Sequence, residues 1–118
     1  MKAVIGAKGE REAAKYLLSL GYELREENVR VGPHDEIDCI AFDPEDRVIV
    51  FVEVKARTAE SDDFLPELNM TPRKRTALTR AARRWVSRNS YEGGYRLDLV
   101  CVVNGIVVEH LKEIEWAE

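Results

Sequence analysis

The chain has 118 residues, 45% hydrophobic and 34% charged, and this composition is typical of one soluble globular domain over residues 1–118. No apolar run is long enough to span a bilayer, and the first residues lack the pattern of a signal peptide. We therefore expect a cytoplasmic protein with no membrane partner. The Cys and His residues show no zinc-site spacing, so Cys39 and Cys101 are expected to be buried thiols.

The formal net charge of −4 is unevenly distributed. Residues 71–88 contain seven Lys and Arg residues and no Asp or Glu, so the remainder of the chain is strongly acidic. A basic segment on an acidic protein is compatible with a polyanion bound at one place. The acidic remainder also leaves open a protein-interaction domain that binds a basic partner.

The first predicted element is a helix over Ala3–Leu20, which ends at Gly21. Glu10 lies in line with the apolar stripe of this helix, where a carboxylate is costly unless another group pairs with it. Two strand-like stretches follow, Tyr22–Val31 and Glu36–Phe42, and the second of them leads into a turn.

The next segment, Arg47–Arg57, contains a continuous β-branched and aromatic run that is typical of a strand covered on both faces. Thr58–Met70 is the longest expected loop, and Thr71 followed by proline indicates a helix start. The last predicted elements are a strand over Tyr95–Val103, a tight turn and a short strand over Ile106–Val108. The order α-β-β-β-α-β-β predicts an α/β fold with a mixed central sheet flanked by helices.

The turn between the second and third strands decides how two acids are placed. If its loop has four residues, 44–47, Asp38 falls opposite Glu53 and shares its face of the sheet. Lys55 lies two residues beyond Glu53 and so points to the same face. The pattern therefore predicts a cluster of Asp38, Glu53 and Lys55, whereas a five-residue loop would separate the acids.

Such a cluster has a definite chemistry. Adjacent carboxylates repel each other unless a cation lies between them, and Mg²⁺, or Mn²⁺ in its place, binds one or two carboxylates together with water and phosphate oxygens. A bound metal of this kind activates water against a phosphodiester, and a lysine beside it stabilises the developing charge. Taken alone, Glu53 and Lys55 are more typical of a solvated ion pair than of a site.

The blocks Glu36-Ile37-Asp38 and Phe51-Val52-Glu53-Val54-Lys55 resemble the PD-(D/E)xK nuclease signature. Nearly the whole chain resembles the YraN family of small bacterial proteins, which are similar to archaeal Holliday-junction resolvases. The other matching residues are Gly9, Glu10, Ala13, Asn28, Arg57, Thr71, Pro72, Arg73, Lys74, Ala82, Arg96 and Asp98. The resemblance implies a restriction-endonuclease-like core and a DNA endonuclease acting on branched or repair intermediates, with a homodimer as one possible assembly.

The resemblance also implies residue roles. It makes Asp38 and Glu53 metal ligands, Lys55 the catalytic lysine, and Glu10 an extra acid directed at the metal from the first helix. The alternatives for Glu10 are an ion pair with Lys55 or Arg57 and a helix that is displaced outward from the core.

Two positions depart from the family pattern. Asp35 stands where the family usually has glycine, and Arg75 where it tends to have glutamine. Asp35 either adds a third acid to the site or ends the loop, and both departures leave the substrate preference open.

The basic helix supplies the candidate nucleic-acid contacts. Lys74 lies on its apolar side near the helix start and is expected to reach toward the site, while Arg73, Arg80 and Arg84 align along one flank. We add Arg57 from the third strand. The alternatives are an ordinary solvated helix face and a non-catalytic nucleic-acid-binding accessory module on a nuclease fold.

Overall fold

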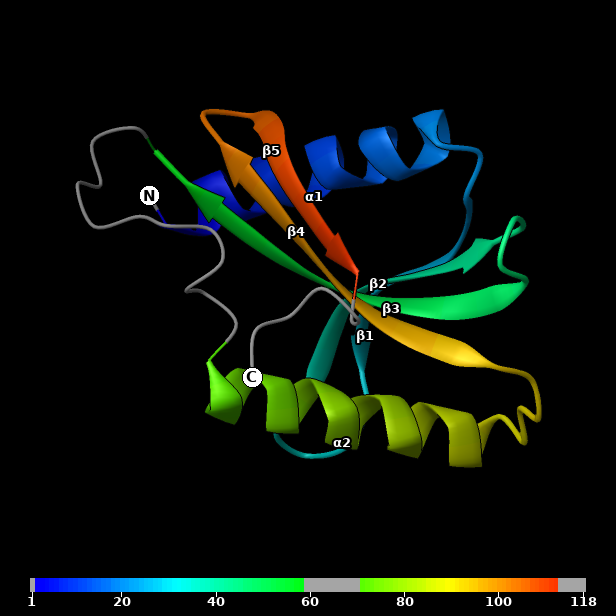
Figure 1. The fold of residues 1–118 in the computed structure, drawn as a ribbon. Coiled ribbons are helices and arrows are strands. Elements are labelled where there is room, and N and C mark those ends of the chain that lie inside the picture. The colour runs from blue at the N-terminus through cyan, green and yellow to red at the C-terminus, as the bar shows by residue number, and fades with distance from the viewer. Residues whose placement is uncertain (1, 59–70, 113–118) are drawn as a thin grey trace.

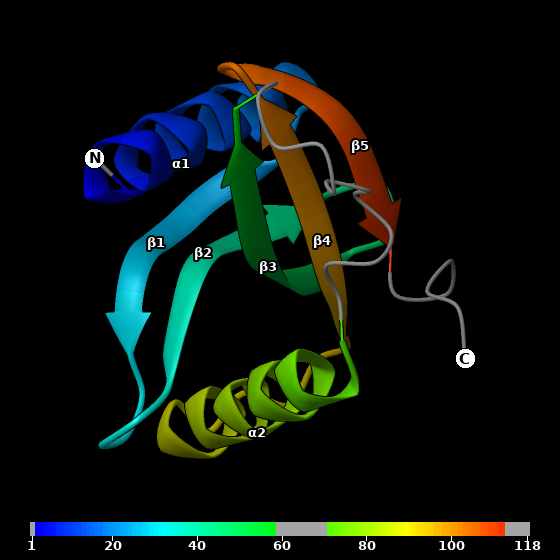
Figure 2. The same ribbon diagram turned by 90° about the vertical axis from the view of Figure 1, so that its left-hand side faces the viewer.

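The computed structural model describes residues 2–58 and 71–112 of the chain. Within them, a five-stranded sheet lies between two helices, one against each face (Figures 1 and 2). The elements are α1 (Lys2–Ser19), β1 (Glu23–Arg30), β2 (Glu36–Asp43), β3 (Val48–Arg57), α2 (Pro72–Arg88), β4 (Tyr95–Val103) and β5 (Ile106–Lys112). This order confirms the predicted α/β arrangement. The predicted loop Thr58–Met70 lies outside the described residues, apart from Thr58.

The sheet is mixed and has the strand order β1-β2-β3-β4-β5. β1, β2 and β3 form an antiparallel meander, β3 and β4 are parallel, and β4 and β5 form an antiparallel hairpin. The prediction of Ile106–Val108 for the last strand was too short, since β5 continues to Lys112, which pairs with Asp98. The polar residues Glu109 and His110 concealed this extension in the sequence.

Each face of the sheet has its own hydrophobic core. Val50 and Val52 of β3 pack on the α1 side, whereas Ile49 and Phe51 pack on the α2 side. This burial on both faces accounts for the continuous apolar run of β3. Trp85 of α2 packs edge-on against Phe51, with ring centroids 5.4 Å apart, so the tryptophan is a core residue.

Helix α1 comes closest to β3 at Gly9. A Cβ atom at this position would collide with the Cβ of Ala56, so glycine is what permits the approach. The neighbouring residue, Glu10, is thereby half-buried near the C-terminal half of β3 rather than in solvent.

A polar cluster around Arg96 joins strands on the α1 side of the sheet. The Arg96 guanidinium donates hydrogen bonds from Nε to Asp98 Oδ1 (2.8 Å) and from Nη1 to Asp43 Oδ2 (3.2 Å). It also donates to the Tyr22 hydroxyl (2.9 Å). The fully buried Asp98 accepts a further hydrogen bond from His110 Nε2 (2.7 Å). We call these five residues the Arg96 cluster; no buried side-chain N or O of the described residues lacks a partner.

Candidate active site

The β2–β3 hairpin has the register that the predicted acid cluster required. Asp43 and Val48 are its first paired residues, so the loop consists of residues 44–47. Counted outward at this register, Asp38 falls beside Glu53 on the neighbouring strand. The four-residue loop on which the prediction depended is therefore confirmed.

The pairing of β2 with β3 ends at Asp38, whose side chain accepts a main-chain hydrogen bond from β3. Cys39 and Val52 are the last paired residues of the two strands. Beyond them, the main-chain N–H of Val54 donates a hydrogen bond to Oδ2 of Asp38 over 2.8 Å. This bond takes the place of the next main-chain pairing and holds the carboxylate against β3, next to Glu53.

Glu53 and Lys55 form an ion pair on one face of β3. Lys55 Nζ lies 3.3 Å from Glu53 Oε2, and the two side chains are only 13% and 23% exposed. Because a solvated surface pair would be far more exposed, the low exposure favours a site over an ordinary surface ion pair.

Glu10 reaches the same region from α1, with Asn28 of β1 as its hydrogen-bond partner. Burial and the nearby carboxylates of Glu27, Glu36 and Glu53 raise the pKa of Glu10. Asn28 has a left-handed backbone conformation with φ of 52°, which asparagine adopts more readily than most residues. The sequence interpretation assigned Asn28 no role; its only local signal was an asparagine inside a strand.

The acids around Asp38 outweigh the nearby positive charge. Burial, the Glu53 carboxylate and Glu10 raise the pKa of Asp38 to about 7, although the Val54 N–H and Lys55 act in the opposite direction. A buried carboxylate is driven toward protonation in this way when no cation neutralises it. The cluster of Asp38, Glu53, Glu10 and Lys55, which we call the acid site, is therefore suited to accept a further cation.

The donor set fits a hard divalent cation in part. No group of three His, Cys, Asp or Glu side chains within residues 2–58 and 71–112 is close enough to enclose a metal by itself. Mg²⁺ commonly binds through one or two carboxylates and takes its remaining ligands from water and substrate phosphate. Asp38 and Glu53 meet that requirement, and Glu10 adds a third acid beside them.

A second lysine faces the acid site from α2. Lys74 and Glu53 line a pocket of about 170 Å³. Burial and the neighbouring Lys55 lower the pKa of Lys74 to about 8. Two lysines from different elements therefore lie beside the acids, as the position of Lys74 on the helix predicted.

Sequence comparison assigns the chain to a protein family. The model of the Uncharacterised protein family UPF0102 matches residues 9–102. The chain belongs to this family. The YraN resemblance is thereby confirmed, and the match includes all four residues of the acid site.

Individual UPF0102 proteins align over most of the chain. One from Mycobacterium sp. (strain KMS) is 41% identical over 102 residues, 86% of this chain and 74% of its own length. One from Chlorobium chlorochromatii (strain CaD3) is 33% identical over 123 residues, which cover 97% of this chain and 92% of its own length. A third, from Oleidesulfovibrio alaskensis, is 43% identical over 98 residues, covering 82% of this chain and 46% of its own. Membership of UPF0102 names no reaction.

Asp35, the residue at which this UPF0102 chain departs from the expected glycine, has a structural partner. Its carboxylate accepts two hydrogen bonds from Arg80, from Nε to Oδ2 (2.8 Å) and from Nη2 to Oδ1 (2.7 Å). The side chain of Arg84 lies over Gly32 of the same β1–β2 connection. Arg80 and Arg84 thus hold this loop against α2. Asp35 lines the same pocket as Glu53 and Lys74, so Arg80 pairs with an acid in the wall of that pocket.

The other two predicted contact residues occupy different surroundings. Arg73 is exposed in the first turn of α2. Arg57 lies on β3 two residues beyond Lys55, and its Nη1 donates to the carbonyl of Ala56 (2.9 Å). Of the predicted nucleic-acid contacts, Lys74 is therefore the one that lines a pocket with a member of the acid site. None of the helices within the described residues is apolar and long enough to cross a membrane.

Proposed function

We propose that this protein is a cytoplasmic, metal-dependent endonuclease that hydrolyses phosphodiester bonds in DNA. One observation carries the proposal: Asp38 and Glu53 on adjacent strands, with Glu10 from α1, form a half-buried cluster in which acids outnumber the adjacent Lys55. An excess of carboxylates in a half-buried cluster is costly for folding, and a divalent cation relieves it.

The side chains divide the chemistry among them. Asp38 and Glu53 would hold Mg²⁺ or Mn²⁺, with Glu10 beside them, and the bound metal would supply Lewis acidity and an activated water. Lys55, 3.3 Å from Glu53, stands where it can orient that water or stabilise charge on a phosphate oxygen. Lys74 faces the same pocket and suits a second phosphate oxygen.

Titration with Mn²⁺, with the free metal followed by EPR, tests this proposal without a guess at the substrate. Wild type should bind the metal, and Glu53→Gln should bind it at least tenfold more weakly. Glu45→Gln, which removes an exposed acid of the β2–β3 turn, is the matched control and should behave as wild type. Equal binding by wild type and Glu53→Gln would contradict a metal site at these acids.

A second candidate function is a non-catalytic nucleic-acid-binding accessory module. The observation in its favour is that three metal-ligating side chains do not converge within the described residues. Cleavage and binding assays with a panel of DNA and RNA substrates separate the two functions. Under the enzyme proposal Glu53→Gln abolishes metal-dependent cleavage and keeps binding. If the protein is an accessory module, wild type binds nucleic acid but does not cleave it, whichever metal ion is added.

Cutting both strands of a duplex in one binding event favours two acid sites, so we also propose a homodimer on the substrate. Light scattering of the complex with duplex DNA tests this stoichiometry, and a 1:1 complex that cuts both strands would contradict it.

A further inference from the structure

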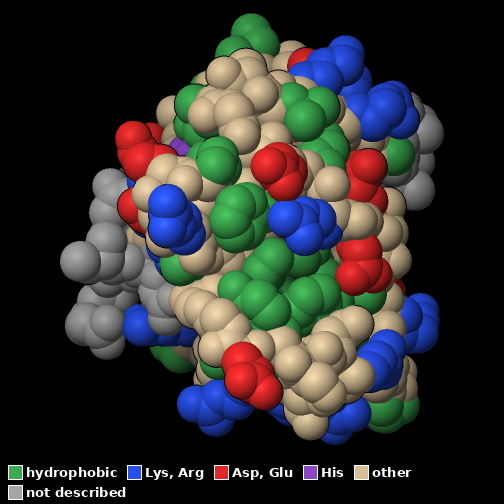
Figure 3. Space-filling view, turned by 90° about the vertical axis from the view of Figure 1, so that its right-hand side faces the viewer, with side chains coloured by type: hydrophobic (Ala, Val, Ile, Leu, Met, Phe, Trp, Pro, Cys, Tyr) green, Lys and Arg blue, Asp and Glu red, His purple; other side chains and the backbone are tan. Residues whose placement is uncertain are grey.

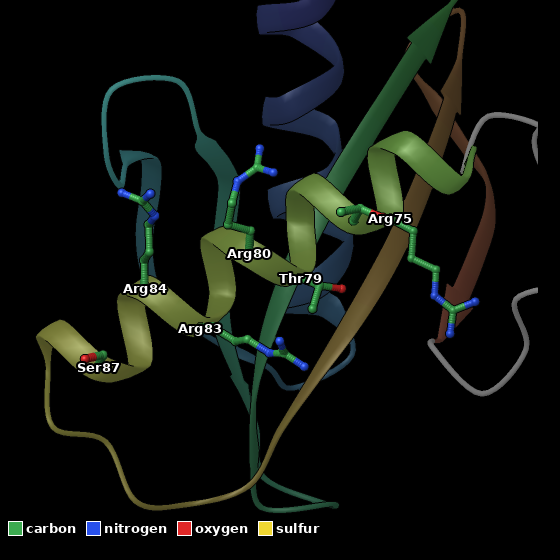
Figure 4. A pocket seen from close by; sticks show the side chains of 7 residues that line it. Arg75, Thr79, Arg80, Arg83, Arg84 and Ser87 are labelled. Atoms are coloured by element: carbon green, nitrogen blue, oxygen red, sulfur yellow. The ribbon is translucent and has the colours of Figure 1, made fainter.

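The outer face of α2 carries a basic groove that the acid site does not use. It has a volume of about 540 Å³, and Figure 4 shows six of the side chains that line it: Arg75, Thr79, Arg80, Arg83, Arg84 and Ser87. No acidic, aromatic or large aliphatic side chain of the described residues lines it. The same helix appears in Figure 3 as a row of basic side chains along the lower edge, below an apolar central region.

The groove runs between two ridges of the helix surface. Arg75, Thr79 and Arg83 follow one another at intervals of four residues and form one ridge, with steps of about 6 Å along the helix axis. Arg80 and Arg84 form the other ridge, and Figure 4 shows them extending to the side of the β1–β2 loop, away from Arg75 and Arg83. Both ridges therefore carry arginines, and hydroxyl side chains lie among them.

One ridge is held in place by the body of the protein. The bidentate ion pair with Asp35 fixes the guanidinium of Arg80, and Arg84 rests over Gly32. A ligand in the groove therefore meets arginines whose side-chain freedom is already restricted, which lowers the entropy lost on binding.

Part of the groove lies on the side of α2 that faces away from the acid site. Lys74, which faces Glu53, and Arg83 are nine positions apart, which corresponds to a rotation of about 180° at 100° per residue. A helix with its side chains is about 10–12 Å thick. A phosphate beside Arg83 is therefore separated from the acid site by the thickness of α2, whereas Arg84 lies only about 80° around the helix from Lys74.

We propose that the outer groove binds the phosphate backbone of a second nucleic-acid segment while a first segment occupies the acid site. Guanidinium and hydroxyl groups are the side-chain donors that proteins direct at phosphates. A protein partner would call for an aromatic or aliphatic anchor, which the lining lacks. The two-segment arrangement rests on the proposed function, because that function places the first segment; binding in the groove does not depend on it.

The salt dependence of binding tests the groove. The probe is a fluorescently labelled 20-base-pair DNA duplex, titrated in EDTA between about 50 and 200 mM NaCl and followed by anisotropy. The variant is Arg75→Ala/Arg83→Ala. Lys15→Ala/Arg25→Ala, which removes two exposed cations from α1 and β1, is the charge-matched control. The DNA affinity of the groove variant should fall about tenfold, and its plot of log K against log salt concentration should become less steep by about 2. The control variant should show neither change. Equal losses in both double variants would overturn the proposal.

A second measurement tests the two-segment arrangement. Wild type mixed with donor-labelled and acceptor-labelled duplexes should bring them together and give energy transfer, and the groove variant should give none while keeping its Mn²⁺ affinity. Lys74→Ala should also lose energy transfer, because it weakens the first segment. If wild type gives no energy transfer but the groove variant still loses affinity and slope, the groove is the sole binding surface and the second-segment proposal is overturned. If wild type does not bind Mn²⁺ but the groove variant loses DNA affinity and salt slope, the proposed function is contradicted. The proposal that the groove binds nucleic acid is then still supported.

Discussion

The Arg96 cluster and the acid site both place carboxylates beside cations next to the sheet, but their charges are balanced differently. Arg96 donates to Asp98 and Asp43, and Asp98 also accepts from His110. Burial alone would lower the pKa of Arg96, yet the hydrogen bonds and charges around it raise that pKa above its ordinary value. The Arg96 cluster is thus electrostatically satisfied by the protein itself.

The acid site lacks this balance. Burial and neighbouring acids raise the pKa of Asp38 to about 7, and Glu10 is shifted in the same direction. In the Arg96 cluster, by contrast, the Asp43 pKa is lowered, because hydrogen bonds from Glu45 and Asp46 N–H and from Arg96 outweigh its burial. A cluster whose charges balance stabilises the fold. A cluster with excess negative charge destabilises it and favours the binding of a cation.

Breaking the Arg96 cluster should give the largest loss of stability. Arg96→Met leaves the fully buried Asp98 without its main cation, so we expect the free energy of unfolding to fall by about 3–5 kcal/mol. Urea denaturation measures this loss. Arg11→Met, at an exposed position of α1, should change the value by less than about 0.5 kcal/mol. A loss of under about 1 kcal/mol for Arg96→Met would show that the cluster is not a source of stability.

Removing one carboxylate charge from the same cluster should have a smaller effect that depends on pH. The folded-state pKa of Asp43 lies below the ordinary value of 3.8 for this group. Its stabilisation is therefore present above that value and is lost as the pH falls through the folded-state pKa. Asp43→Asn should cost about 2 kcal/mol at pH 7 and less at pH 3. Urea denaturation at the two pH values measures both costs, and an equal cost would contradict the charge interaction.

Removing a carboxylate charge from the acid site should have the opposite sign. Because the pKa of Asp38 is raised from 3.8 to about 7, the metal-free folded state is penalised progressively as the pH rises through that interval. Asp38→Asn retains an acceptor for the Val54 N–H and should stabilise the metal-free protein by about 1–2 kcal/mol at pH 8. Denaturation in EDTA at pH 5 and pH 8 measures this gain, with Glu45→Gln as control. Destabilisation at pH 8 would mean that Asp38 is a structural acid.

The smallest effect should come from the hydrogen bond between Asn28 and Glu10. Asn28→Gly keeps the left-handed backbone available and removes the amide that contacts Glu10. Mn²⁺ affinity should fall roughly tenfold, as is typical when a residue that orients a metal ligand is lost. Denaturation midpoints check that the fold is retained. Unchanged Mn²⁺ affinity would remove Glu10 and Asn28 from the site.

The sequence by itself determined the order of the elements and the core of the acid site. The turn residues 44–47 set the hairpin register, and the two-residue period of a strand placed Lys55 with Glu53. These relations are local or follow from counting along two strands joined by a tight turn. The resemblance to the YraN family suggested Glu10 as a further member of this set.

Only the tertiary structure decided which groups that are distant in the sequence form hydrogen bonds and ion pairs with one another. The pairing of Asp35 with Arg80, the hydrogen bond between Asn28 and Glu10, and the burial of Asp98 against Arg96 join segments that no periodicity relates. The separation of Lys74 from the outer groove of α2 likewise depended on which helix face the sheet covers. Charge balance is a sum over neighbours in space, so the same residue types gave a satisfied cluster at Arg96 and an unsatisfied one at Asp38.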